Sequence, residues 1–234
     1  MAEVIRVNFG KPMPLFPLPD AVLLPHAIQP LHIFEPRYCA MIQDCMDSAG
    51  QIAMASFTEA TIKSPHSNGQ SRVRPAVCIG QIVHHESLAD GRHNILLHGV
   101  CRARIQKVIE ADEDRPYRLA SLTPLENVEE EAPPLDDIRT GLRKMLGGPR
   151  LCRMRGVDTV IEWFDRSDVS THALLELIGF ALVRDNNVKY KLLAEPNVQE
   201  RAKVLQCELQ RIDHLVQRAD HQSHKDWPKG MSWN

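Results

Sequence analysis

The chain has 234 residues, of which 43% are hydrophobic and 25% are charged. This composition is typical of a soluble globular protein and excludes collagen-like, mucin-like and wholly disordered chains. The 28 Lys and Arg residues nearly balance the 30 Asp and Glu residues, so the formal net charge is only -2. Such a charge gives no electrostatic reason to bind nucleic acid or an anionic membrane. The length fits either one large domain or two small ones.

The cysteines and the N-terminal segment indicate the cellular compartment of the protein. The six cysteines are scattered without a CxxC pair, and we expect them to be reduced thiols. Glu3 and Arg6 interrupt the N-terminal segment, so it does not have the pattern of a signal peptide. No stretch approaches the about 18 apolar residues that a membrane span needs. These features predict a cytoplasmic protein without a membrane segment.

Residues 1–125 are expected to be mostly β. Their apolar residues recur with a period of two, and Pro, Gly and Asp-Gly interrupt the pattern, as in short strands joined by turns. One helix is expected within this half, because Pro36 suits a first helical turn and Gly50 suits a stop. The apolar residues between them recur at helical spacing: Tyr38, Met41, Ile42, Cys45 and Met46.

The clearest hairpin is expected around Asp90 and Gly91, a dipeptide that suits a tight two-residue turn. With that turn, Ile82 lies opposite Gly99 on the core face of the two strands. Arg102 then falls on the other face, which the mixed polar and apolar pattern predicts to be half solvated.

The second half of the chain is expected to be helical. An acidic run that ends in two prolines marks a linker at residues 126–134. Apolar stripes at helical spacing follow at 135–146, 157–164 and 171–183, and the last is apolar enough to lie in the middle of a bundle. A longer helix is expected after a cap at Asn197, with Glu200 completing a capping box and a heptad-like seam running to Ala219.

The predicted organisation is therefore an α+β fold in four parts. A mainly antiparallel β subdomain occupies residues 1–125, and the linker occupies 126–134. An α-helical bundle with a long C-terminal helix occupies 135–219, and a flexible tail occupies 220–234.

The sequence contains no complete catalytic template. GxSxG and HExxH are absent, and no Walker loop precedes the Gly10-Lys11 pair. Four histidines fall within the predicted hairpin, but only His85 and His98 are expected to converge, which is fewer than the three protein ligands of a zinc site. Surface histidines on a half-solvated strand explain them. We therefore expect no metal, no cofactor and no enzymatic activity.

The run LHIFEPRY at residues 31–38 is the densest in the sequence. It combines the end of an apolar strand, the start of a helix and two opposite charges between aromatic residues. Glu35 and Arg37 are expected to pair and to fix this structural corner. Phe34 and Tyr38 are expected to fill the core beside them.

The same run carries a family resemblance. The segments PLFPL at 14–18, LLP at 23–25 and PLHIFEPRY at 30–38 resemble the start of the N-terminal substrate-binding domain of the Lon protease family. LLELIGFAL at 174–182 and KLLAEPN at 191–197 resemble the helical subdomain of that region. Two positions depart from the family pattern: His26 stands where glycine is common, and Cys101 where an aromatic residue or arginine is usual.

The resemblance implies a PUA-like β-barrel followed by a helical bundle. In full-length Lon proteases this region precedes an ATPase and a Ser-Lys peptidase, and because neither follows here the chain resembles a stand-alone Lon N-domain. The implied function is non-enzymatic recognition of unfolded or exposed polypeptide segments, with polypeptide clients or a protease as partners. We place peptide binding at Leu31, His32 and Tyr38.

Two other functions stay open at this point. PUA-like barrels occur in RNA-modifying proteins, although the near-zero charge and an aromatic content of 5% argue against nucleic acid as a partner. The helix that ends at Ala219 would suit an oligomerising adaptor of a Lon-type protease, and the sequence leaves the oligomeric state open.

Overall fold

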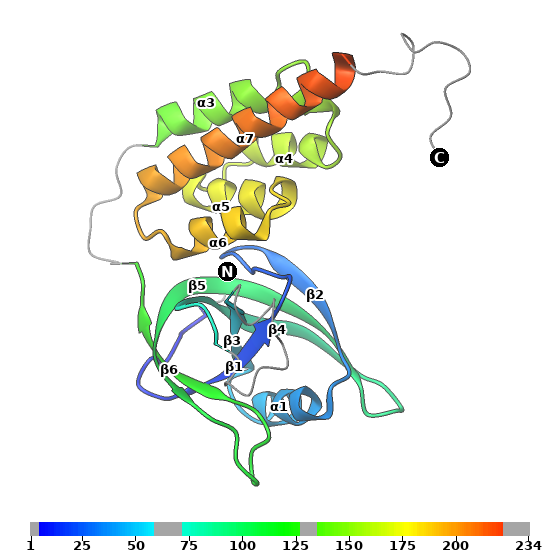
Figure 1. Cartoon of the computed structure of the whole chain (residues 1–234), viewed down its shortest axis with the longest axis vertical. Coiled ribbons are helices and arrows are strands. Elements are labelled where there is room, and N and C mark those ends of the chain that lie inside the picture. Colours follow the sequence, from blue (N-terminus) through cyan, green and yellow to red (C-terminus); the bar gives the residue numbers. More distant parts are fainter. Residues whose placement is uncertain (1–4, 59–71, 127–134, 222–234) are drawn as a thin grey trace.

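The computed structural model of the chain describes residues 5–58, 72–126 and 135–221. In these ranges the strands come first and most of the helices follow, as Figure 1 shows, which confirms the predicted α+β fold. The first half contains β1 (Met13–Leu18), β2 (Ile28–Ile33), α1 (Pro36–Met46), β3 (Gln51–Ser56), β4 (Ala76–Ser87), β5 (His93–Ile109) and β6 (Leu119–Pro124). The second half contains α3 (Asp136–Leu146), the 3-10 turn η1 (Leu151–Arg153), α4 (Val157–Phe164), α5 (Thr171–Leu182), α6 (Asn186–Ala194) and α7 (Val198–His221).

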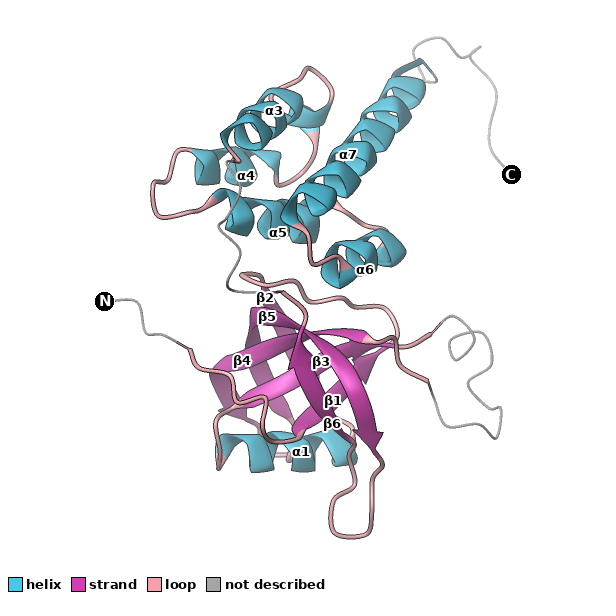
Figure 2. Ribbon diagram, turned by 90° about the vertical axis from the view of Figure 1, so that its left-hand side faces the viewer, coloured by secondary structure: helices cyan, strands magenta, loops and turns pink. Residues whose placement is uncertain are grey.

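Five of the strands form a closed ring of pairings. Their order is β5-β4-β3-β1-β6, and β6 returns to pair with the second half of β5. Among the described strands, β2 pairs with β5 alone, so it is an edge strand. β1 and β3 run parallel, and the other pairs are antiparallel. Helix α1 lies at the end of the barrel that faces away from the bundle (Figure 2).

The two faces of β3 belong to two apolar clusters. Ala53 and Ala55 join a smaller cluster made by β1, β4, β5 and β6. Ile52 and Met54 join a larger cluster that contains α1 and also the buried residues of α3, α4, α5, α6 and α7. A single apolar core thus runs from the barrel into the bundle.

The division into subdomains at residues 126–134 stays a prediction. Residues 127–134 of the linker and 222–234 of the tail lie outside the described residues. Within the described ranges, no helix combines the length and the apolar character that crossing a membrane requires.

The β4–β5 hairpin differs from the prediction. Its turn spans residues 88–92, where Leu88 N donates to Arg92 O at 2.8 Å, so the two-residue loop was wrong. The Asp90 side chain helps to close this wider turn by accepting from the Arg92 backbone N at 3.1 Å. Ile82 therefore pairs with Leu97, and bulges shift the register at two points along β4.

The N-terminal caps of α6 and α7 differ in part from those predicted. α6 was missed, although the Asp185 side chain caps it by accepting from Asn187 N at 2.8 Å. The predicted Asn197 cap of α7 forms, and its side chain accepts from Glu200 N at 3.2 Å. The second half of the predicted capping box was wrong, because Glu195 rather than Glu200 accepts from Asn197 N, at 2.9 Å.

Leu24 lies where the barrel meets the bundle. A Cβ at Gly99 of β5 would lie 2.1 Å from the Leu24 carbonyl oxygen, and a Cβ at Gly179 of α5 would lie 3.3 Å from Leu24 Cδ1. Gly99 therefore needs to be glycine, because a side chain there would collide with the backbone, whereas at Gly179 the contact is only tight. The turn continues through His26, whose φ of 64° lies in the left-handed region. This backbone conformation favours glycine, and histidine adopts it less often.

A network of four charged side chains joins the barrel to the bundle; three of them are buried, and the Glu126 side chain is 34% exposed. Arg102 of β5 is 2% exposed, Glu176 of α5 is 2% exposed and Arg201 of α7 is 3% exposed. Arg102 donates to Glu176, and its Nη1 donates to Glu126 Oε1 at 3.0 Å. Arg201 reaches the same carboxylates, with Nη1 at 2.7 Å from Glu126 Oε1 and Nε at 3.1 Å from Glu176 Oε1. The half-solvated position predicted for Arg102 was wrong, because the bundle covers it.

Removal of one member of this network should destabilise the fold strongly. Arg102→Met leaves Arg201 as the one remaining arginine of the network beside Glu176 and Glu126. Removing one partner of a buried ion pair costs roughly 3–5 kcal/mol. Arg166→Met is the matched control, because the side chains of the Arg166–Asp168 pair are 59% and 65% exposed. That change should cost less than about 1 kcal/mol. Urea unfolding measures both, and similar small losses in the two variants would contradict a structural role for the network.

His172 should make this junction sensitive to acid. Burial, followed by the charges of Arg201 and Arg102, lowers the pKa of His172 from 6.5, and Glu126 opposes the shift. Because the folded state favours the neutral imidazole, neutral His172 contributes to the free energy of unfolding. This contribution is fully present above pH 6.5 and is lost as the pH falls through the folded-state pKa. His172→Gln should therefore lose less stability between pH 7.5 and pH 5.5 than the unchanged chain, as measured by urea unfolding. His214→Gln, at an exposed position of α7, is the control. An unaltered pH dependence in His172→Gln would refute this assignment.

Candidate functional site

The structure separates the three residues predicted to bind a peptide. Tyr38 of α1 is 6% exposed, and its ring packs edge-on against Phe16 with 4.7 Å between the centroids. Leu31 and His32 lie on β2 and line a different depression from the one that Tyr38 lines. The structure thus brings Leu31 and His32 together and places Tyr38 in a separate pocket.

The predicted corner forms in part. Arg37 Nε and Nη2 donate to Glu35 Oε2 at 3.0 and 2.7 Å, as expected from their spacing. Phe34 is 63% exposed, so the expectation that it fills the core was wrong. Ile33 takes the inward position at the end of β2, and the next side chain therefore points outward. The Phe34 ring stacks with His32, with 6.2 Å between the centroids.

The outer side of β2, β5 and β4 exposes apolar side chains, and we call it the sheet face. Its members are Ile28, Pro30, His32 and Phe34 from β2 and the residue after it, Leu96 and Asn94 from β5, and Val83, His84 and Glu86 from β4. Ile28 and Val83 are each 51% exposed. A sheet with one face in the core normally presents polar side chains on the other, so exposed apolar residues here indicate a contact surface.

A depression of about 350 Å³ lies in the sheet face. Pro30 pairs with Leu96 and His32 pairs with Asn94, so residues of the edge strand and of β5 form its floor together. Leu31 and His84 also line it. Exposed Ile28 and Phe34 lie two residues before Pro30 and two residues after His32 on the same strand side. Apolar side chains thus extend beyond both ends of the depression.

A polar ladder crosses the sheet face at one end of the depression. His32 Nδ1 lies 2.8 Å from Asn94 Oδ1, and Asn94 Nδ2 donates to Glu86 Oε2 at 2.8 Å. Because the amide oxygen can only accept, the His32 Nδ1 carries a proton, and its Nε2 accepts from Arg92 Nη1 at 3.4 Å. The ladder fixes the side chains at this end before any ligand arrives.

The free edge of β2 is protected in its middle. Gly99 N donates to Ala27 O at 2.8 Å, so antiparallel alternation turns the backbone groups of Gln29 toward β5 and those of Pro30 away from it. Pro30 has no N–H, and Gln29 Nε2 donates to the Pro30 carbonyl at 3.1 Å. These features oppose pairing with a further strand, so a ligand is expected to contact the side chains of the sheet face.

The histidines of the hairpin do not form a metal site. His85 Nε2 lies 3.0 Å from His93 Nδ1, so the predicted convergence of His85 with His98 was wrong. The bulge at Val83 turns His85 to the side of His93. In the described parts of the chain, no group of three or more His, Cys, Asp or Glu residues could hold a metal ion.

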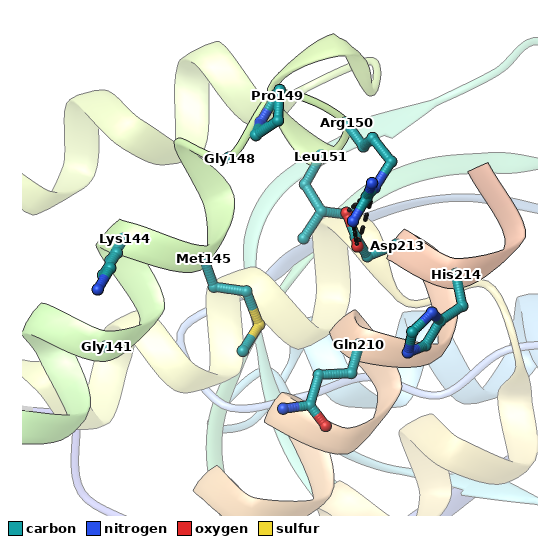
Figure 3. Close-up of a pocket in the computed structure, with 10 residues that line it drawn as sticks. All are labelled: Gly141, Lys144, Met145, Gly148, Pro149, Arg150, Leu151, Gln210, Asp213 and His214. Carbon is teal, nitrogen blue, oxygen red and sulfur yellow. Dashed lines mark hydrogen bonds and ion pairs between the residues drawn. The ribbon is translucent and has the colours of Figure 1, made fainter. Parts of the chain in front are cut away.

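The bundle contains a second depression, a groove of about 390 Å³ between α3 and α7 (Figure 3). Met145 and Leu151 line it with apolar atoms. Arg150 and Asp213 form a bidentate pair at its side, with Arg150 Nε and Nη2 each within 3.0 Å of a carboxylate oxygen. Each charge of this pair is thus already neutralised by the other.

Comparison with known proteins identifies the architecture first. The fold of this chain is similar to that of solved Lon N-terminal domains. The N terminal domain of Mycobacterium avium complex Lon protease matches with a TM-score of 0.63 and 20% identity, over 83% of this chain and 96% of that one. The Lon N-terminal domain protein from Xanthomonas campestris matches with a TM-score of 0.58 and 20% identity, over 84% of this chain and 98% of that one.

The family follows from the sequence. The model of the ATP-dependent protease La (LON) substrate-binding domain matches residues 12–211, and the chain belongs to this family. Lon protease 3 of Sorangium cellulosum (strain So ce56) is 28% identical over 100 residues, and Lon protease of Escherichia coli (strain K12) is 29% identical over 101 residues. Each match covers 43% of this chain and 12% of the relative, so the chain matches a small part of those proteins.

Proposed function

We propose that this chain is a non-enzymatic recognition or adaptor module that binds exposed apolar segments of polypeptides on the sheet face. One observation carries the proposal: Ile28, Val83 and Phe34 are exposed around a depression on the side of the sheet that is normally polar. Membership of a substrate-binding family supports it, because the substrate of a protease is a polypeptide.

The chemistry of the sheet face suits a polypeptide. Burial of apolar area contributes about 25 cal/mol per Å², so an apolar segment gains by covering Ile28, Leu96 and Phe34. The backbone of the segment also needs polar partners, and His84 is exposed beside the depression to supply one. The protected edge of β2 favours contacts with side chains over the addition of a strand. Such contacts suit polypeptide segments of different sequence.

The absence of catalysis is also part of the proposal. Burial raises the pKa of Cys45 to about 12 and that of Cys101 to about 11, so both stay thiols at neutral pH and are poor nucleophiles. RNA binding is less well supported, because Arg92 beside the sheet face pairs with Asp90 and the face offers a single aromatic side chain, Phe34, for stacking on bases.

Replacement of two exposed apolar residues should weaken binding without unfolding the chain. We expect Ile28→Ser with Phe34→Ser to reduce the affinity for a fluorescent, permanently unfolded polypeptide by about tenfold or more, since two apolar contacts are lost. Their exposure keeps the change in stability within about 0.5 kcal/mol. Fluorescence anisotropy measures the binding, and urea unfolding checks the fold.

The matched control removes equally exposed apolar residues elsewhere. Met46 and Leu215 are 44% and 47% exposed and lie in α1 and α7, so Met46→Ser with Leu215→Ser should leave the affinity within about twofold. Equal losses in both double variants, or none in either, would refute the sheet face as the binding surface. A steep fall of RNA binding with salt would instead favour the nucleic-acid alternative.

A further inference from the structure

A smaller pocket lies in the barrel near α1. Its volume is about 220 Å³, and it is lined by residues from β1, α1, the end of β3 and the segment before β6. The lining residues are Leu15, Pro17, Arg37, Tyr38, Phe57, Glu110, Ala111, Pro116, Tyr117 and Arg118. Prolines, leucine and aromatic rings thus provide its apolar walls.

Hydrogen bonds hold these walls in place. The Tyr117 hydroxyl donates to Asp44 Oδ2 at 2.6 Å, which ties the segment before β6 to α1. Arg115 Nε donates to Tyr117 O at 3.0 Å, and Arg115 Nη2 donates to Glu110 O at 2.7 Å. The pocket is therefore formed without a ligand, as a preorganised site requires.

The pocket presents hydrogen-bond donors. Tyr38 is buried apart from 6% of its surface, and its hydroxyl makes no hydrogen bond to any residue that the structure describes. Burial raises the pKa of Tyr38, so the phenol keeps its proton and can donate. Arg37 Nε and Nη2 donate to Glu35, and within the described ranges Nη1 donates to no protein atom. These two donors are therefore open to an acceptor from outside the chain.

The charges of the pocket leave room for an anionic acceptor. Arg37 pairs with Glu35 beside the pocket and Arg118 pairs with Glu110 in its lining, so neither carboxylate is unpaired. Glu110 Oε2 accepts from Arg118 Nε at 2.9 Å, which neutralises the carboxylate that would otherwise repel an anion. A carboxylate on an apolar group matches both the donors and the walls.

We infer that this pocket binds the C-terminal residue of a polypeptide. The apolar side chain of that residue lies between the proline and aromatic walls, and its α-carboxylate accepts from the Tyr38 hydroxyl and the Arg37 guanidinium. The inference rests on the proposed function for its class of ligand, a polypeptide. It adds a second site, distinct from the sheet face, that distinguishes a chain end from an internal segment.

A pair of peptides tests this inference. A ten-residue peptide that ends in leucine and carries a dye at its N-terminus is prepared with a free carboxylate and with a C-terminal amide. The free acid should bind about tenfold or more tightly than the amide, because a charge-assisted hydrogen bond is lost in the amide. Equal affinity of the two peptides overturns the inference and leaves the sheet-face proposal untouched.

Variants assign the preference to the pocket. Tyr38→Phe keeps the packed ring and removes the hydroxyl, and Arg37→Gln removes the guanidinium, so each should bring the acid-to-amide ratio toward one. Arg166→Gln is the matched control, because Arg166 forms the same kind of pair two residues away, with Asp168, on the bundle surface. An acid preference that survives Tyr38→Phe and Arg37→Gln overturns the assignment to this pocket.

Two further arms separate the possible ligands and sites. The Ile28→Ser and Phe34→Ser double variant should keep the ratio of acid to amide affinity even where both affinities fall. The reason is that the sheet face does not contact the α-carboxylate. N-acetyl-leucine should compete far less well than the free-acid peptide. Equal competition by this small acid overturns the inference in favour of a site for small carboxylic acids.

Discussion

The fold depends on how the barrel meets the bundle, where two buried arginines share two carboxylates. Desolvation opposes this arrangement, since burial raises the pKa of Glu176 and lowers that of Arg201. Arg102 and Arg201 compensate by contacting both Glu176 and Glu126. Such a network is unfavourable unless its members are placed accurately, so it fixes the barrel against the bundle more specifically than apolar contact alone. Leu24 reinforces it through its close approach to β5 and α5.

Strand β5 connects this junction to the sheet face. Arg102 lies in its second half and enters the buried network, whereas Leu96 and Asn94 in its first half belong to the sheet face. The same strand is therefore anchored at one end by the bundle and open to a ligand at the other. Tyr38, by contrast, belongs to α1, which lies at the end of the barrel that faces away from the bundle. The proposed contacts with a polypeptide thus lie on a scaffold whose rigidity comes from elsewhere in the molecule.

Much of the fold could be predicted because its signals are local. The stripes predicted at 135–146, 157–164 and 171–183 correspond to helices whose observed bounds differ by about a residue at most. α6 was missed because it is short and buries few side chains, chiefly Leu192 and Leu193, so no periodic stripe marks it. The hairpin register failed because bulges are a property of strand pairing, which a single strand's pattern does not contain.

The candidate site was only partly predictable for the same reason. Leu31 and His32 were placed on the surface by sequence, and alternation from Ile33 could have indicated that Phe34 points outward. The burial of Arg102 could not be predicted, because it depends on helices more than seventy residues away along the chain that cover β5. Charge alone suggests solvent, and a tertiary partner such as Glu176 overrides that expectation.

The central claim, that polypeptides bind the sheet face, is tested most directly by methyl NMR during titration with an unfolded apolar polypeptide. The account predicts saturable shifts at Ile28, Val83 and Leu96, while Met145 and Leu151 in the bundle groove stay unchanged. Shifts confined to the bundle groove, with the sheet-face methyl groups unmoved, would contradict it.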